Sequence, residues 1–209
     1  MLPAPSLLAL IFIFVASYQD YKDREISDFI WVASLPVLSA LFVVFFRDFL
    51  INLIPAALLV PASYYMAKKG LMGEADPLAL LIVALGFPQT FVIFPAYLII
   101  FFLALLSELA AFGVIIAGKD GRGAPSPFTY RIKKDSLNNF WLPRDDKGRY
   151  LYDINDPRPI KELMEESKKK IEGDTVWATP ILPFLPFIFI SCLVVFFIMI
   201  GLLFSAILA

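Results

Sequence analysis

The sequence contains no histidine, and this absence removes several classes of catalytic and metal-binding site. Serine–histidine–aspartate triads, cysteine–histidine pairs and the H-E-x-x-H zinc site all need an imidazole. The chain also has a single cysteine, Cys192, which lies in an apolar run, so neither a disulfide framework nor a cysteine metal site is available. We therefore expect no bound metal and no cofactor.

Charge is scarce as well. Charged residues make up 18% of the chain, whereas 59% of the residues are hydrophobic and the mean hydropathy is +0.76. A soluble domain is about 45–50% apolar, so the excess requires lipid. A helix needs about 20 apolar residues to cross the hydrocarbon core, so the 209 residues predict an all-α polytopic membrane protein with about six transmembrane helices and one polar insertion.

Apolar and polar runs divide the chain into expected spans and loops. The six apolar segments are residues 2–19, 29–46, 49–67, 77–87, 90–117 and 180–209, and Pro95 interrupts the fifth. The domain prediction follows from them: residues 1–117 form a membrane domain with five helices, residues 118–176 form a cytoplasmic polar insertion between helices 5 and 6, and residues 177–209 carry the last transmembrane helix.

The end of the insertion, residues 159–171, has a helical pattern with its apolar residues near one face. These residues are Ile160, Leu163, Met164 and Ile171. Such a helix can lie on the membrane surface or pack on neighbouring loops, and the sequence leaves both interpretations open.

The positions of lysine and arginine predict the orientation in the cell membrane. Of the 18 basic residues, 17 lie in the loops after the first, third and fifth apolar segments, and only Arg47 does not. Because basic residues accumulate in cytoplasmic loops, we expect these loops and the insertion to be cytoplasmic and both termini to be outside. Trp31, Trp141 and Trp177 are interpreted as anchors at the membrane interface.

Two acidic residues stand at the ends of apolar segments. Asp20 follows the first segment and Asp76 precedes the fourth, and the predicted topology brings both to the cytoplasmic face although they are 56 positions apart. Two neighbouring carboxyl groups do not both ionise easily and share a proton. One then acts as general base on a water molecule while the protonated one polarises a scissile carbonyl. The structural alternatives are that Asp76 caps a helix ahead of Pro77 and that Asp20 marks where a helix leaves the lipid.

The motifs around these residues resemble those of a known family. The motif Asp20-x-x-x-Arg24-Glu-Ile26 and the motif Gly73-Glu-Ala-Asp76 resemble the archaeal preflagellin and prepilin peptidases, which are membrane aspartyl proteases of the GxGD type. Residues 175–183, ahead of the last span, are also similar to that family. The resemblance implies that Asp20 and Asp76 form the catalytic dyad. It further implies cleavage of short basic leader peptides from archaellin or type IV pilin-like precursors at the cytoplasmic membrane face.

The chain departs from the family pattern at Ala75, where the strict motif has glycine. The residues beside the aspartates are candidates for substrate binding, because glycine lets a backbone approach an extended peptide and acidic side chains attract a basic leader. These candidates are Gly73, Glu74, Ala75, Asp23 and Glu25. The expected partners are such precursors and membrane lipid, and the sequence gives no support for a nucleic-acid partner.

Glu108 suggests a rival function, because a carboxyl group inside an apolar segment is a functional candidate. The rival is a small proton-coupled membrane transporter whose path uses Asp20, Asp76 and Glu108. It predicts internal repeats, and the sequence has none that are convincing. A protonated Glu108 bonded to a neighbouring helix is the structural alternative, and a membrane scaffold protein is a third possible function.

Overall fold

The structure is a computed structural model that describes residues 4–23, 26–44, 57–65, 75–87, 90–91, 94–125, 128–138, 141–152, 156, 158 and 160–208. The chain divides into two compact units. The first comprises Met1–Tyr21, Ile26–Ser107 and Phe184–Ala209, and the second comprises Lys22–Glu25 and Glu108–Pro183. Both are described separately below.

Helices dominate the described residues, and three of them are long and apolar enough to cross a membrane. These are α1 (Ala4–Asp23), α5 (Ala96–Ile116) and α7 (Leu185–Leu208), the last over Leu185–Ser205. Their length and composition are compatible with a helical membrane protein. The apolar helices α2 (Asp28–Val44) and α4 (Asp76–Gly86) are shorter in their apolar parts. Of the third predicted span only residues 57–65, which are helical, are described.

Helix α4 is short because turn-forming residues close it at both ends. It begins where the Ala79 amide donates to the Ala75 carbonyl oxygen at 3.0 Å, and Pro77 stands in the first turn, where its missing N–H costs nothing. It ends at Gly86, and the Phe87 amide closes the last turn on Val83 at 2.9 Å. Eleven residues rise about 16 Å, roughly half of the ~30 Å hydrocarbon core.

The start of the fifth predicted span differs from the expectation. That span was predicted from residue 90 with an interruption at Pro95, whereas α5 begins at Ala96, directly after this proline. Ahead of it the chain forms a short antiparallel pair, β1 (Thr90–Phe91) and β2 (Phe94–Pro95). Proline lacks the amide hydrogen that a helix interior requires, and it disfavours helical conformation in the residue before it, so the helix starts after it.

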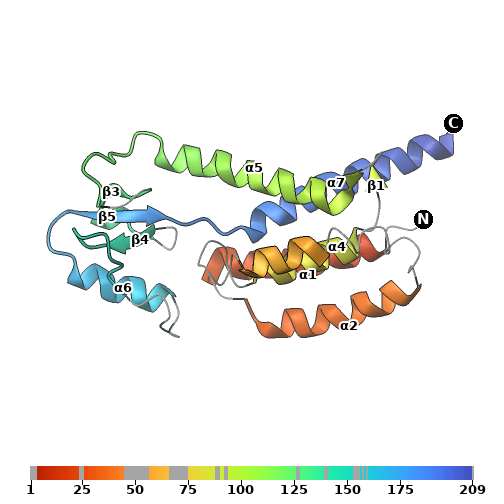
Figure 1. The fold of residues 1–209 in the computed structure, drawn as a ribbon, viewed down its shortest axis with the longest axis horizontal. Helices are drawn as coiled ribbons and strands as arrows, with labels where there is room; N and C mark the ends of the chain where they lie inside the picture. The colour runs from red at the N-terminus through yellow and green to blue at the C-terminus, as the bar shows by residue number, and fades with distance from the viewer. Residues whose placement is uncertain are drawn as a thin grey trace. The chain divides into compact units, whose positions relative to one another are not determined.

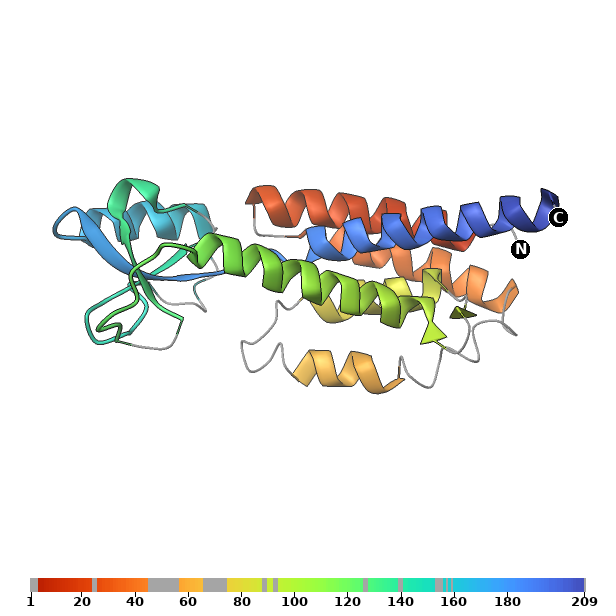
Figure 2. The ribbon, with the colours of Figure 1, turned by 90° about the horizontal axis from the view of Figure 1, so that it is seen from above.

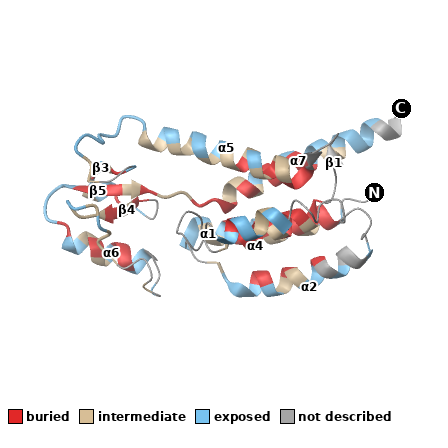
Figure 3. Ribbon diagram, viewed as in Figure 1, coloured by how far each residue is buried: buried red, intermediate tan, exposed pale blue. Residues whose placement is uncertain are grey.

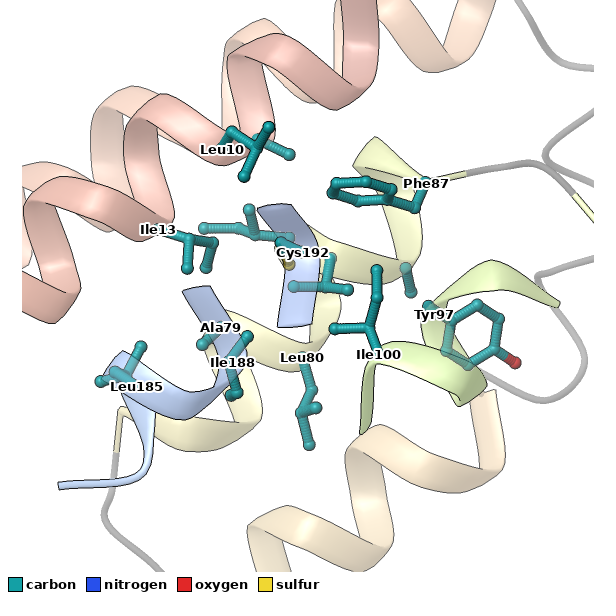
Figure 4. Packing of buried hydrophobic residues seen from close by; sticks show 14 of the residues in the cluster. Leu10, Ile13, Ala79, Leu80, Phe87, Tyr97, Ile100, Leu185, Ile188 and Cys192 are labelled. Atoms are coloured by element: carbon teal, nitrogen blue, oxygen red, sulfur yellow. The ribbon is translucent and has the colours of Figure 1, made fainter. Parts of the chain in front are cut away.

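The core of the first unit is built around α4, which is apolar on every side and is accordingly buried (Figure 3). Helix α4 packs against α2 and α7, and a buried hydrogen bond joins it to α1. Figure 4 shows Ile13 of α1, Ala79 of α4 and Ile188 of α7 close together in this core. All three are fully buried.

The second unit contains a three-stranded antiparallel sheet that was not predicted. Its strands are β3 (Tyr130–Lys133), β5 (Thr175–Pro180) and β4 (Trp141–Arg144), with β5 in the centre, and the 3-10 helix η1 (Lys134–Ser136) follows β3. The expected all-α architecture is therefore correct for the apolar helices and incomplete for the insertion. Residues 175–180, expected to lead into the last span, form the central strand, and α7 starts only at Leu185.

Helix α6 (Ile160–Lys170) forms where the helical pattern predicted it, and its apolar face packs inside the second unit. Leu163 and Met164 are each 2% exposed, and Met164 and Ile171 share a core with the sheet residues Val176 and Ala178. Packing on neighbouring segments is thus confirmed, and the apolar face of α6 is covered by protein.

The interpretation of the tryptophans as interfacial anchors is wrong for Trp141, which lies in the core of the second unit. Trp177 is buried in the central strand of the same sheet, and Trp31 is buried among the helices of the first unit. Tryptophan supplies large apolar area to a core, and here it is used for packing.

Candidate active site

One face of α1 carries the residues that pack against the rest of the first unit. The buried residues Ser6, Ala9, Ile13 and Ala16 recur at intervals of three and four, which is the spacing of a single helical face. Asp20 continues the same series and is half-buried. The carboxyl group predicted to be catalytic therefore stands on the packed stripe of α1.

A close contact fixes α1 against α4. The Ser6 hydroxyl donates to the Gly86 carbonyl oxygen at 2.8 Å, and the bond is buried. A Cβ placed on Gly86 would lie 2.1 Å from the Cβ of Ala9, so only glycine fits there. The two helices run in opposite directions in both ribbon views (Figures 1 and 2).

This antiparallel contact determines which ends of the helices are neighbours. Asp76 lies ten residues before Gly86, a rise of about 15 Å. The same rise along α1 from Ala9 reaches Gln19, the residue before Asp20. Asp20 and Asp76 therefore lie at the same end of the helix pair and within about one helical turn of the same level.

Helix α7 is joined to the same end of α1. The Ser17 hydroxyl donates to the carbonyl oxygen of Leu185 at 2.9 Å in a buried bond. Ser17 is one turn before Asp20, and Leu185 is the first residue of α7. The start of α7 thus packs beside the turn of α1 that precedes Asp20.

Asp76 is the more enclosed of the two carboxyl groups, with 5% of the residue exposed. Ala75 occupies the cap position of α4, so Asp76 lies inside the first turn and is not the cap residue. A negative charge is stabilised in that turn by the helix dipole. Asp20 and Asp76 each make a polar or electrostatic contact with their surroundings.

The remaining predicted site residues are only partly described. Ala75 is half-buried at the start of α4, and Asp23 is exposed at the last residue of α1. Gly73, Glu74 and Glu25 lie outside the described residues. Glu108 is half-buried on α5 and belongs to the second unit.

The helix contacts made by three small residues were not predicted from the sequence. These residues are Ser6, Ser17 and Gly86. The available signal was their spacing relative to Asp20 and Asp76, since small residues permit close helix approach in membranes. Among the described residues, no group of three or more histidine, cysteine, aspartate or glutamate side chains is arranged to hold a metal ion.

Comparison of the chain with models of protein families, with curated proteins and with solved structures gives no match.

Proposed function

We propose that the protein is a membrane aspartyl endopeptidase of the preflagellin and prepilin peptidase type, with Asp20 and Asp76 as its catalytic dyad. The observation that carries this proposal is the antiparallel contact of α1 and α4. It gives a buried Asp76 and a half-buried Asp20 at one end of the same helix pair.

The chemistry requires only these two carboxyl groups and water. The ionised carboxylate removes a proton from water, and the resulting hydroxide forms a bond to the scissile carbonyl carbon. The protonated carboxyl group donates to the carbonyl oxygen as its negative charge develops. Collapse of the tetrahedral intermediate breaks the C–N bond, and the proton taken from water goes to the leaving amine.

The proposed topology has six transmembrane helices, both termini outside and the polar insertion, residues 118–176, in the cytoplasm. Two observations support it: three helices are long enough to cross a membrane, and 17 of the 18 basic residues lie in the loops that this topology makes cytoplasmic. In this arrangement the Asp20–Asp76 end of the helix pair opens at the cytoplasmic face. The proposed substrates are archaellin or type IV pilin-like precursors, whose short basic leaders suit the acidic residues that neighbour Asp20 and Asp76 in the sequence.

Cleavage of a basic-leader pilin precursor by the purified full-length chain tests the proposal. We expect the wild-type protein to release the leader, and Asp20→Asn and Asp76→Asn each to abolish release. Asn keeps the shape of the side chain and removes the acid. Asp146→Asn, in an exposed turn of the second unit, is the matched control and should cleave normally.

Each variant is first shown to insert into membranes and to elute as a single species in detergent. Inactivity of a folded Asp76→Asn protein together with an active Asp146→Asn protein supports the dyad. Normal processing by folded Asp20→Asn or folded Asp76→Asn would refute it.

A further inference from the structure

A run of cationic residues follows the end of α5. Residues 117–134 contain five cationic residues and one acidic residue, a net charge of +4. Four of the cations are exposed, and we refer to these as the basic strip: Lys119, Arg122, Arg131 and Lys133. The fifth is Lys134, whose ammonium group donates to the Ile171 carbonyl oxygen at 2.9 Å and so joins two segments of the second unit.

The basic strip lies along one edge of the sheet. The Arg131 amide donates to the Asp120 carbonyl oxygen at 2.9 Å, so the loop after α5 runs beside the outer edge of β3. The carboxylate of Asp120, the acidic residue of this run, accepts the Arg122 amide at 2.9 Å. Two cations from the loop and two from the strand are thereby gathered at the same edge.

Arg131 is exposed and lies over an aromatic ring. Its guanidinium carbon lies 4.7 Å from the ring centroid of Trp177, over the indole face. A guanidinium over an aromatic ring keeps its positive charge, and its fork of N–H donors matches the oxygens of a phosphate group.

An exposed aromatic residue stands beside the strip. Phe128 is 66% exposed and has a φ of +58°, a conformation that a bulky L-residue rarely adopts. Its ring packs edge-on against Phe112 with the centroids 6.1 Å apart. Phe112 belongs to the last two turns of α5, so Phe128 is held at the depth where that apolar helix ends. Exposed aromatic side chains are favourable at that depth, at the boundary of lipid and water.

We propose that the basic strip and Phe128 form an interfacial site for anionic phospholipids, in which the strip binds headgroup phosphates and Phe128 enters the headgroup boundary. Lys119 and Arg122 follow the end of α5 by only three and six residues. If α5 spans the membrane, both cations therefore lie at the membrane surface. Cations in this position attract acidic lipids. A lipid fits better than an acidic soluble protein, since the strip is tethered to the bilayer and is accompanied by an exposed aromatic ring.

Hydrogen exchange of the full-length chain in nanodiscs tests this site independently of any proteolytic activity. Discs of phosphatidylcholine alone are compared with discs of equal parts phosphatidylcholine and phosphatidylglycerol. We expect exchange in peptides covering residues 118–134 to be about fivefold slower in the anionic discs, and the difference to disappear at high salt. Phe128→Ser should raise exchange of the same peptides in both kinds of disc.

Two variants with neutralised cations test whether the lipid dependence comes from the basic strip or from positive charge in general. Replacing the four residues of the basic strip by glutamine should abolish the lipid dependence. Replacing four cations of α6 by glutamine, at Lys161, Lys168, Lys169 and Lys170, should leave it unchanged. Unaltered exchange in the sheet peptide covering residues 175–180 shows that each variant is folded.

Equal exchange in the two kinds of disc, or lipid dependence that survives neutralisation of the strip in a folded protein, would overturn the proposal. Protection of residues 118–134 by soluble polyglutamate and not by phosphatidylglycerol would also overturn it, and would assign the strip to an acidic protein.

Discussion

The hydroxyl of Ser6 donates a buried hydrogen bond of 2.8 Å to the carbonyl oxygen of Gly86, joining residues 80 positions apart. The last carbonyl groups of a helix have no partner within that helix, and Ser6 supplies one for α4. The bond holds the first turn of α1 against the last turn of α4. It therefore sets the register in which Asp20 and Asp76 come to the same end of the helix pair.

Gly86→Ala should separate these two helices. The added Cβ would lie 2.1 Å from the Cβ of Ala9 and 3.3 Å from the Pro5 carbonyl oxygen, so backbone must move. We expect a loss of about 1–3 kcal/mol in the free energy of unfolding. Thermal unfolding in detergent measures this, and cleavage of the precursor should fall in parallel because the dyad loses its register.

Two further variants test the cause of that loss. Gly113→Ala, on α5, has no atom within 4 Å of its added Cβ and should change stability by less than about 1 kcal/mol. Combining Gly86→Ala with Ala9→Gly removes the methyl group that clashes and should restore part of the stability, as expected for residues in contact. Equal effects of Gly86→Ala in the presence and absence of Ala9→Gly would contradict the contact.

Hydrophobic runs and a 3.6-residue period are local signals, and they predicted α6 and, in outline, the apolar helices that the structure describes, although α5 begins at Ala96 and not at residue 90. The sequence also predicted that Asp20 and Asp76 come to one end of the helices, since basic residues assign loops to one face. The contact between Ser6 and Gly86, which places the two aspartates within about one helical turn of the same level, was not predicted. Ser6 and Gly86 stand in helices that are apolar almost all round, where the hydrophobic pattern does not indicate which face meets which helix.

The sheet of the second unit was missed for a different reason. Strands β3 and β4 have four residues each, too few for periodicity to distinguish them from loops. Strand β3 pairs with β5, with Lys133 opposite Thr175, so the sheet depends on contacts between distant segments. The residues of β5 were instead interpreted as the approach to the last span because α7 follows them closely.

Ser17→Ala should weaken the attachment of α7 to α1. The variant removes the 2.9 Å bond to the Leu185 carbonyl oxygen, and buried hydrogen bonds between membrane helices contribute roughly 0.5–1.5 kcal/mol. Unfolding in mixed detergent measures the loss. Ser205→Ala is the control, because that residue is exposed and its hydroxyl donates to the Gly201 carbonyl oxygen of its own helix at 2.9 Å. Equal stability of the Ser17→Ala and Ser205→Ala proteins would show that the bond does not hold the helices together.

Met164→Ala should destabilise the second unit by about 2–4 kcal/mol, because Met164 is 2% exposed and its truncation leaves a cavity in the core. Trp141 lies in the same core, so the change is visible as altered tryptophan fluorescence during unfolding. Lys161→Ala, exposed on the same helix, should have little effect. A helix lying on the membrane would behave differently: Met164→Ala would change lipid binding and leave the Trp141 signal unaffected.

The turn after β4 should open in acid. The Asp145 carboxylate accepts the Arg149 amide at 2.8 Å, the Arg149 Nε at 2.8 Å and the Lys147 amide at 2.9 Å. The backbone hydrogen bond from Arg149, together with its side chain and the Lys147 amide, holds the pKa of Asp145 below its usual value in spite of partial desolvation. The unfolded carboxyl group, with a pKa of about 4, binds protons more readily. The stability contributed by Asp145 is therefore complete above that pH and is lost as the pH falls through the folded pKa.

The backbone amide of Arg149 reports this transition directly, because it donates to the carboxylate that titrates. We expect its NMR chemical shift to titrate with a midpoint below the ordinary pKa of an aspartate in the wild-type protein. Asp145→Asn should remove the titration, whereas Asp146→Asn, at the next position of the same turn, should preserve it. A midpoint at the ordinary value of an aspartate would show that the hydrogen bonds do not stabilise the charged form, and persistence of the titration in Asp145→Asn would assign it to another group.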